Sequence, residues 1–157
     1  MADIFKAGEI VDIAIQIERN GYAFYKELSK TSRNFPVQEA FGLMAAEEKE
    51  HIAAFEKLSE KSGAFTPPES YPGEYMLYLK AFAGQNIFTK EKQGSAAADK
   101  VSSDAEAIDM AVGFEKDSII FYYDMKKFIP REEEGVIDSL IDEEKKHLER
   151  LLRLRKS

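Results

Sequence analysis

The sequence predicts an all-α protein built as a four-helix bundle with one long crossover between its second and third helices. Four stretches place apolar residues at the helical period, and no segment alternates at period two for long. The connections between these stretches are short, long and short, which is the order of such a bundle. The 157 residues, 44% of them hydrophobic, suffice to bury the core of a single domain over residues 1–157.

Helix signals delimit the four stretches. The first covers residues 6–29, and the second covers residues 36–61, with a proline in its first turn. A Ser-x-x-Glu capping box opens the third, over residues 103–128, and Pro130 opens the fourth, which continues to the C-terminus. The first and second stretches, and likewise the third and fourth, are joined by only a few residues. The two helices of each such pair are therefore expected to be antiparallel neighbours.

The crossover, at about residues 62–103, can run the full length of the bundle, since each long helix spans about 35 Å at ~1.5 Å per residue. Within it we expect a short helix over residues 74–83 and a small, polar, mobile segment over residues 91–102. Its aromatic residues either cover a homodimer interface, which we expect, or pack on the chain's own bundle. These residues are Tyr71, Tyr75, Tyr78, Phe82 and Phe88.

The two halves of the chain resemble each other. Residues 9–18 align without gaps on residues 106–115, and residues 47–51 align on residues 143–147. A repeat of two helices implies a pseudo-twofold axis along the bundle. The repeated polar residues are therefore expected to act in pairs across that axis.

Glutamate and histidine at helix spacing form the motif that carries chemistry. The chain has two histidines, and each follows a glutamate by three positions, in Glu48-x-x-His51 and Glu144-x-x-His147. Residues three apart share a helix face, and here that face is the apolar one. A further glutamate interrupts the apolar stripe of the first helix and of the third. The predicted ligand set is Glu18, Glu48, His51, Glu115, Glu144 and His147.

Four buried carboxylates repel one another and lose hydration, at a cost of several kcal/mol each, so an uncompensated set is not expected. No basic residue occupies these faces, whereas two divalent cations would compensate the four charges. One Glu from each of two helices and Glu-x-x-His from each of the other two is the ligand set of di-iron and di-manganese bundles. Two iron ions fit these ligands, with manganese or zinc as alternatives. The competing interpretation is an ordinary bundle whose acidic residues face water.

Residues beside the ligands are expected to orient them. A metal-bound imidazole usually donates its other N–H to a carboxylate or a carbonyl. Glu47 and Glu143 directly precede the ligand glutamates of the second and fourth helices. We predict that Glu47 bonds His147 and that Glu143 bonds His51; the alternative is that both glutamates are plain surface residues.

Tyrosines and small residues also share the ligand face. Tyr22, Tyr25 and Tyr122 either hydrogen-bond the carboxylates or serve as core aromatics with a polar tip. Gly21 and Ser118 each follow a ligand glutamate by three positions. Their small size either leaves room for O₂ or peroxide or allows close helix packing.

On its four helices and six matched ligands, the sequence resembles the ferritin-like superfamily, and most of all the di-iron domain of rubrerythrins. The resemblance implies that the six residues bind two irons and are catalytic, with Glu48 and Glu144 as bridges and one histidine on each iron. It also implies the family's reaction, which is oxidation of the diferrous site by H₂O₂ or O₂. Electrons would return from a rubredoxin-type partner.

The chain departs from rubrerythrins in two places. They carry a C-terminal rubredoxin domain with four cysteines, whereas this chain has no cysteine, so a separate electron donor is needed. They also carry an additional carboxylate one turn after the glutamate of the third helix, where this chain has Ser118. Two alternatives to a peroxidase therefore stay open: a ferroxidase that handles iron as ferritins do, and a bundle with structural metal that binds a partner.

Composition excludes several function classes. The formal net charge of −7 argues against nucleic-acid binding, which needs a clustered basic surface. Without cysteine, disulfide scaffolds, thiol catalysis and iron–sulfur clusters are ruled out.

No apolar run reaches the length of a membrane span or a signal peptide, so we expect a cytoplasmic protein that does not bind membranes. The basic tail that begins at Arg150 is interpreted as a helix C-terminus complementing its dipole.

Overall fold

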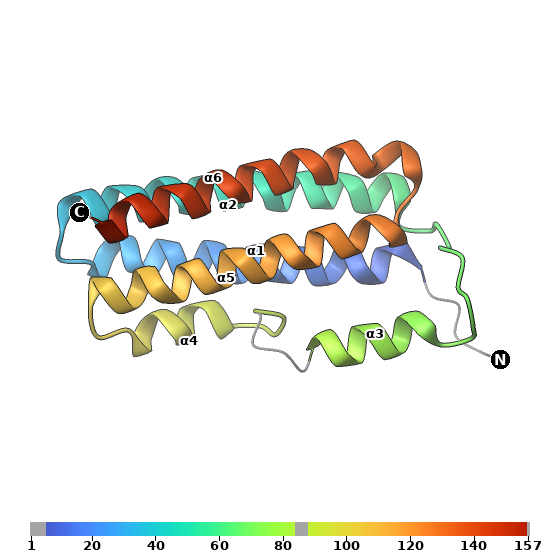
Figure 1. Cartoon of the computed structure of the whole chain (residues 1–157), viewed down its shortest axis with the longest axis horizontal. Coiled ribbons are helices and arrows are strands. Elements are labelled where there is room, and N and C mark those ends of the chain that lie inside the picture. The colour runs from blue at the N-terminus through green and yellow to red at the C-terminus, as the bar shows by residue number, and fades with distance from the viewer. Residues whose placement is uncertain (1–5, 84–87, 157) are drawn as a thin grey trace.

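The computed structural model describes residues 6–83 and 88–156 and confirms the all-α prediction (Figure 1). Within these residues there are four long and two short α-helices and no strand. The helices are α1 (Ala7–Thr31), α2 (Phe35–Ser62), α3 (Glu74–Ala83), α4 (Gln93–Lys100), α5 (Asp104–Met125) and α6 (Glu134–Lys156). Residues 1–5 belong to the N-terminal stretch in which the sequence predicts no signal peptide, and they lie outside the residues that the structure describes. None of the described helices combines the length and apolar content needed to cross a lipid bilayer.

The four long helices α1, α2, α5 and α6 lie side by side along the longest axis of the molecule (Figure 1). The chain reverses direction between α1 and α2 and again between α5 and α6. The crossover carries the chain from the end of α2, at one end of the bundle, to the start of α5, at the other, and α3 and α4 lie along it. The predicted order of short, long and short connections is confirmed.

Local sequence sets where the long helices begin. The side chain of Asn34 accepts a hydrogen bond from the backbone N–H of Val37 (3.3 Å), and Pro36 occupies the first turn of α2. Ser103 Oγ accepts from the backbone N–H of Glu106 (3.1 Å), one of the two hydrogen bonds of the predicted capping box.

The joint between α5 and α6 differs from the prediction by a few residues. Two 3₁₀ turns, Lys126–Phe128 and Arg131–Glu133, flank Pro130. The backbone of Pro130 is extended, with ψ at 142°, so the helical path cannot start at that residue. The regular helix α6 therefore begins at Glu134.

We expected a small, polar, mobile segment over residues 91–102, and the structure shows that residues 93–100 of it form α4, which packs on α1. The carboxamide of Asn20 holds this part of the crossover. It donates to the carbonyl oxygens of Phe88 (3.1 Å) and Lys90 (2.8 Å) and accepts from the backbone N–H of Gly94 (3.0 Å). A Cβ at Gly94 would overlap the carbonyl oxygen of Asn20. The small residues that resemble a linker are therefore what lets α4 approach α1.

Four of the five aromatic residues named for the crossover, all but Tyr71, contact the chain's own bundle. The hydroxyl of Tyr78 donates to Asp124 on α5 (2.9 Å), whereas Tyr71 is 53% exposed. The ring pairs are Phe82–Phe121, Tyr75–Phe128 and Phe88–Phe114, with centroids 4.2, 4.5 and 4.8 Å apart. These contacts agree with the alternative interpretation of the aromatic residues, and the homodimer stays a prediction.

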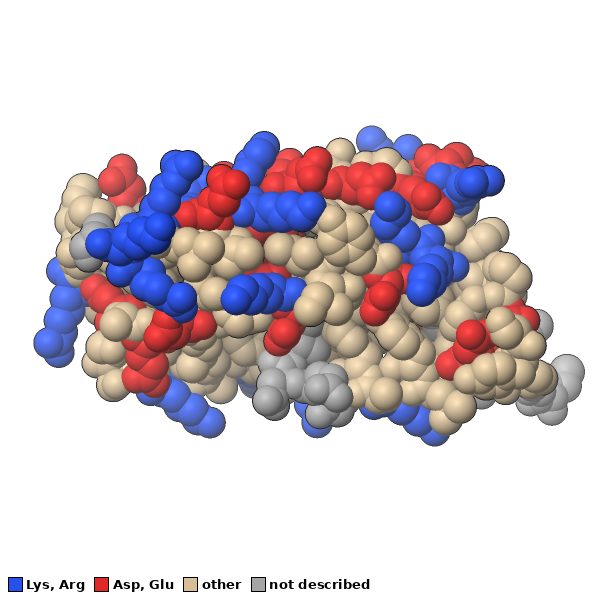
Figure 2. Space-filling view, viewed as in Figure 1, with Lys and Arg blue, Asp and Glu red and all other residues tan. Residues whose placement is uncertain are grey.

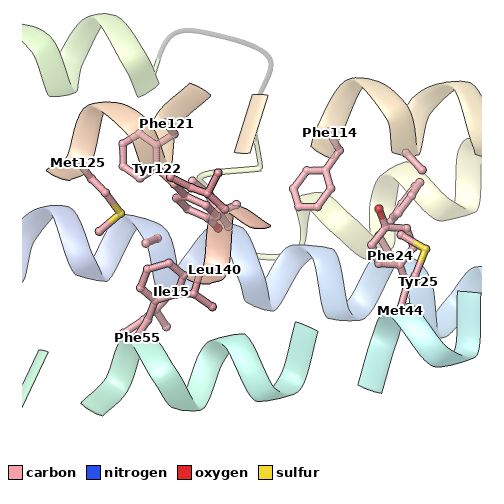
Figure 3. Close-up of a cluster of buried hydrophobic side chains, with 14 of the residues drawn as sticks. Ile15, Phe24, Tyr25, Met44, Phe55, Phe114, Phe121, Tyr122, Met125 and Leu140 are labelled. Carbon is pink, nitrogen blue, oxygen red and sulfur yellow. The ribbon is translucent and has the colours of Figure 1, made fainter. Parts of the chain in front are cut away.

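Large apolar side chains form two groups along the bundle axis (Figure 3). One group contains Ile15, Phe55, Phe121, Tyr122, Met125 and Leu140, and the other contains Phe24, Tyr25, Met44 and Phe114. Along α1, Glu18 falls between the residues that it contributes to the two groups. The polar residues of the site are thus enclosed by apolar packing on both sides.

Candidate metal centre

The structure brings all six predicted ligand residues together inside the bundle. Glu18 lies on α1 and Glu115 on α5, while α2 and α6 each supply a glutamate and, one turn later, a histidine. Each of the six residues is at most 1% exposed. The spacing of three positions places both side chains of each Glu-x-x-His pair on the inward face, as predicted.

The six residues form two overlapping groups, each with one candidate ligand atom per residue within 4.8 Å of the others. The groups share Glu48 and Glu144. One group is completed by Glu18 and His51. The other is completed by Glu115 and His147.

The two shared carboxylates each turn one oxygen toward each histidine. Glu144 Oε1 lies 3.1 Å from His51 Nδ1, and its Oε2 lies 3.0 Å from His147 Nδ1. Glu48 Oε1 lies 3.2 Å from His147 Nδ1, and its Oε2 lies 3.7 Å from His51 Nδ1. The imidazole rings face each other with centroids 5.4 Å apart. This is the arrangement that two carboxylates bridging two cations require.

The outer nitrogen of each histidine bonds the predicted glutamate. His51 Nε2 lies 2.7 Å from Glu143 Oε2, and His147 Nε2 lies 2.9 Å from Glu47 Oε2. Both predicted contacts are confirmed. An N–H donated outward at Nε2 fixes the ring, so that Nδ1 faces the carboxylates and can serve as the ligand atom once it is deprotonated.

Two of the three tyrosines hydrogen-bond the carboxylates, as one interpretation predicted. The hydroxyl of Tyr122 on α5 donates to Glu18 on α1, and the hydroxyl of Tyr25 on α1 donates to Glu115 on α5. Tyr22 is only half-buried, and no such bond to it is found in the described part of the chain. The repeat is therefore visible in the hydrogen bonds as well as in the sequence.

The small residues Gly21 and Ser118 serve close packing. A Cβ at Gly21 would lie 3.0 Å from the ring of Phe114 and 3.3 Å from Glu48 Oε2, so that ring occupies the space beside the glycine. The hydroxyl of Ser118 donates to the backbone carbonyl of Phe114 (3.0 Å) and thus bonds its own helix.

Protons are redistributed within the cluster. Burial and the adjacent Glu18 raise the pKa of Glu48 to about 8, and burial and neighbouring carboxylates raise that of Glu144 well above its usual range. Burial opposes ionisation of Glu18, but the neighbouring Glu48 and His51 side chains and the hydroxyl of Tyr122 lower its pKa to about 2. Burial also lowers the pKa of His51 and His147, but the surrounding carboxylates raise it far more. Protons on these groups therefore offset the carboxylate charges at neutral pH.

The donor atoms of the cluster fit two divalent cations. In the described residues, nine buried side-chain N or O atoms lack a hydrogen-bond partner, and all but the hydroxyls of Ser32 and Ser62 belong to the six ligand residues. Buried polar atoms without partners are costly, and both histidine Nδ1 atoms are among them. Carboxylate oxygens and imidazole nitrogens suit iron and manganese, and they also bind zinc.

Arg150 also belongs to the site, and the sequence interpretation missed it. Its guanidinium donates to both oxygens of Glu47, from Nη1 at 2.7 Å and from Nη2 at 3.4 Å. Although burial opposes ionisation, hydrogen bonds from Arg150 and His147 lower the pKa of Glu47. Arg150 follows His147 by three positions, and this spacing was the available signal.

Comparison with known proteins identifies the family of this chain. The rubrerythrin family model matches residues 9–155, which is most of the chain. The chain belongs to the rubrerythrin family. Its 157 residues contain no cysteine and no rubredoxin domain. No curated protein matches the chain significantly.

Two solved structures share the fold of this rubrerythrin-family chain. A protein of Thermotoga maritima described as ferritin-like and diiron-carboxylate is 26% identical, with a TM-score of 0.73, and the match covers 100% of this chain and 99% of that one. A hypothetical protein from Pyrococcus furiosus is 20% identical, with a TM-score of 0.66, over 97% of this chain and 89% of that one. The predicted ferritin-like fold is confirmed.

Proposed function

We propose that this protein is a non-haem di-iron oxidoreductase that reduces hydrogen peroxide or O₂ with electrons from an external donor. One observation carries the proposal: Glu48 and Glu144 each direct one oxygen to each of two buried histidines. Membership of the rubrerythrin family supports iron as the metal.

The chain's residues divide the work of such a centre. Glu18 and His51 would hold one iron, Glu115 and His147 the other, and the shared glutamates both. When bound, two ferrous ions supply the two electrons that, with two protons, convert one H₂O₂ into two molecules of water.

The surroundings orient the ligands and limit access of water. Tyr122 and Tyr25 each hold a terminal carboxylate from the opposite helix, and Glu47 and Glu143 hold the imidazoles at Nε2. The apolar groups on both sides exclude bulk water, which strengthens every charge interaction inside.

A ferroxidase that handles iron is the second candidate, and Ser118 favours it. Rubrerythrins carry an additional carboxylate at this position. Here the buried hydroxyl of Ser118 donates instead to the backbone carbonyl of Phe114. Helix α5 therefore contributes one carboxylate, Glu115, to the cluster. The same six residues would then hold ferrous iron as a substrate while O₂ or H₂O₂ oxidises it for sequestration.

The test is to purify the protein without oxygen, load it with ferrous iron, count bound iron, and follow oxidation by limiting H₂O₂ spectroscopically. We expect two irons per chain, rapid oxidation, and loss of both in a Glu48→Ala, His51→Ala double variant. Repeated turnover of H₂O₂ with a reduced rubredoxin as donor supports the peroxidase, whereas uptake of many irons per chain supports iron handling. A diferrous protein inert to both O₂ and peroxide would contradict both and leave a structural metal.

A further inference from the structure

The two histidines of the candidate centre are held from outside in different ways. His147 bonds Glu47, and Arg150 binds both oxygens of that carboxylate. His51 bonds Glu143, for which no cationic partner is found among the described residues other than the histidine itself. The Glu143 side chain is 48% exposed, against 30% for Glu47. The carboxylate that bonds His147 is therefore fixed by a second partner, Arg150, whereas the carboxylate that bonds His51 is not.

This difference departs from the internal repeat. The alignment that matches Glu47 with Glu143 also matches Arg150 with Ala54. Ala54 is a half-buried apolar residue with no group that could bind a carboxylate. The second half of the repeat therefore supplies a guanidinium that the first half lacks.

We propose that Arg150 is a positioning residue that makes the two cation positions unequal, so that the cation at His147 is held longer than the cation at His51. The proposal rests on the dinuclear centre proposed above. A guanidinium bound to both oxygens of a carboxylate restricts its geometry as well as its position. Outer partners of metal-bound histidines change metal affinity by roughly 10–100-fold. Glu143 has no such restraint, so the His51 ring can move away from a cation more readily.

The positive charge of Arg150 acts in the opposite direction, because it repels a cation. That charge is paired with Glu47 at 2.7 Å, so the pair together adds little net charge near the centre. Both side chains are also partly exposed, at 29% and 30%, and solvent screens what remains. We therefore expect the restraint on geometry to outweigh the repulsion.

The test follows the loss of Co²⁺ from the fully loaded protein to excess chelator by visible absorption in a stopped-flow instrument. We expect two phases of equal amplitude in the unmodified protein. Arg150→Ala should accelerate the slow phase about tenfold and leave the fast phase unchanged. Glu143→Ala should accelerate only the fast phase. Arg150→Lys keeps the charge without the two-pronged contact and should give an intermediate slow rate.

Arg153→Ala is the matched control. It removes an equal charge from the same end of α6, and no contact of Arg153 with Glu47 is found in the described residues. Figure 2 shows Lys and Arg side chains gathered around this end of the molecule. The control should leave both rates unchanged.

Three results would overturn the proposal: a single phase in the unmodified protein, a slow phase that Arg150→Ala leaves unchanged or retards, or the same effect from Arg153→Ala. Failure of the protein to bind two Co²⁺ per chain would refute the dinuclear centre itself. The two failures are therefore distinguishable. Circular dichroism verifies that each variant remains helical.

Discussion

The hydroxyl of Tyr122 on α5 donates a hydrogen bond to Glu18 on α1. The repeat contains the reciprocal bond, in which the hydroxyl of Tyr25 on α1 donates to Glu115 on α5. Each helix of the pair therefore fixes a carboxylate of the other. Burial and the adjacent carboxylates raise the pKa of both tyrosines well above the usual value of 10, so both hydroxyls stay donors.

Tyr122→Phe removes one of these donors while keeping the ring. We expect the pKa of Glu18 to rise from about 2, because one of the hydrogen bonds that lower it is lost. Co²⁺ affinity should fall about tenfold. The free energy of unfolding should fall by about 1–2 kcal/mol, because a buried carboxylate oxygen loses its partner. Co²⁺ titration and urea denaturation measure the two effects.

Tyr78→Phe is the control for loss of a hydroxyl group. The hydroxyl of Tyr78 donates to Asp124 (2.9 Å), outside the ligand cluster. This variant should leave the Co²⁺ affinity unchanged. Equal losses of affinity in the two variants would contradict the role assigned to Tyr122.

Metal binding should become tighter as pH rises. A cation must displace protons from groups whose pKa the cluster raises, among them Glu48 at about 8 and both histidines. We expect the Co²⁺ affinity to increase between about pH 6 and 8, with release of protons. Isothermal titration calorimetry in buffers of different ionisation enthalpy counts these protons. An affinity independent of pH over this range would be the contrary result.

Protein prepared without metal should lose stability as pH rises from about 4.5 to about 8. The pKa of Glu48 is about 8 in the folded protein and 4.5 ordinarily, so between these values only the folded state keeps the proton. Stability therefore falls as pH rises through that window. The raised histidine pKa acts in the same direction, since its contribution is complete only below about pH 6.5.

Urea denaturation at pH 5 and pH 8 measures this loss, which we expect to be roughly 2–4 kcal/mol. Glu48→Gln removes the titrating carboxylate and should reduce the difference between the two pH values. A protein more stable at pH 8 than at pH 5 would show that the carboxylates do not share protons in this way.

The clustering of the six candidate ligands could be predicted from sequence because the helical period determines which residues share a face. Glu48 and Glu144 interrupt apolar faces, and each precedes a histidine by one turn, so their inward direction follows from spacing alone. The partners Glu47 and Glu143 follow from chain adjacency and the repeat. These inferences need only local geometry and one assumption about which faces meet.

The remaining features depend on contacts between segments that are distant in the sequence. The contact of Arg150 with Glu47 joins α6 to α2, and a basic residue near a helix C-terminus has a simpler local explanation. The packing of α4 depends on Asn20, whose three hydrogen bonds reach residues of the crossover. Neither the Arg150–Glu47 contact nor the packing of α4 on Asn20 can be inferred from the spacing of apolar residues within one segment.

Gly94→Ala tests that packing directly. Because a Cβ at Gly94 would overlap the carbonyl oxygen of Asn20, α4 must move outward. We expect the free energy of unfolding to fall by about 1–3 kcal/mol. Amide hydrogen exchange should accelerate in α4, while α2 and α6 keep their protection.

Gly113→Ala is the matched control, because this glycine lies within α5 and a Cβ there would meet nothing within 4 Å. It should increase the free energy of unfolding by about 0.5–1 kcal/mol through helix propensity alone. The two glycine-to-alanine changes therefore have opposite expected signs. If Gly94→Ala were also stabilising, α4 would not lie against Asn20 as the structure has it, and the crossover would be a loosely attached segment.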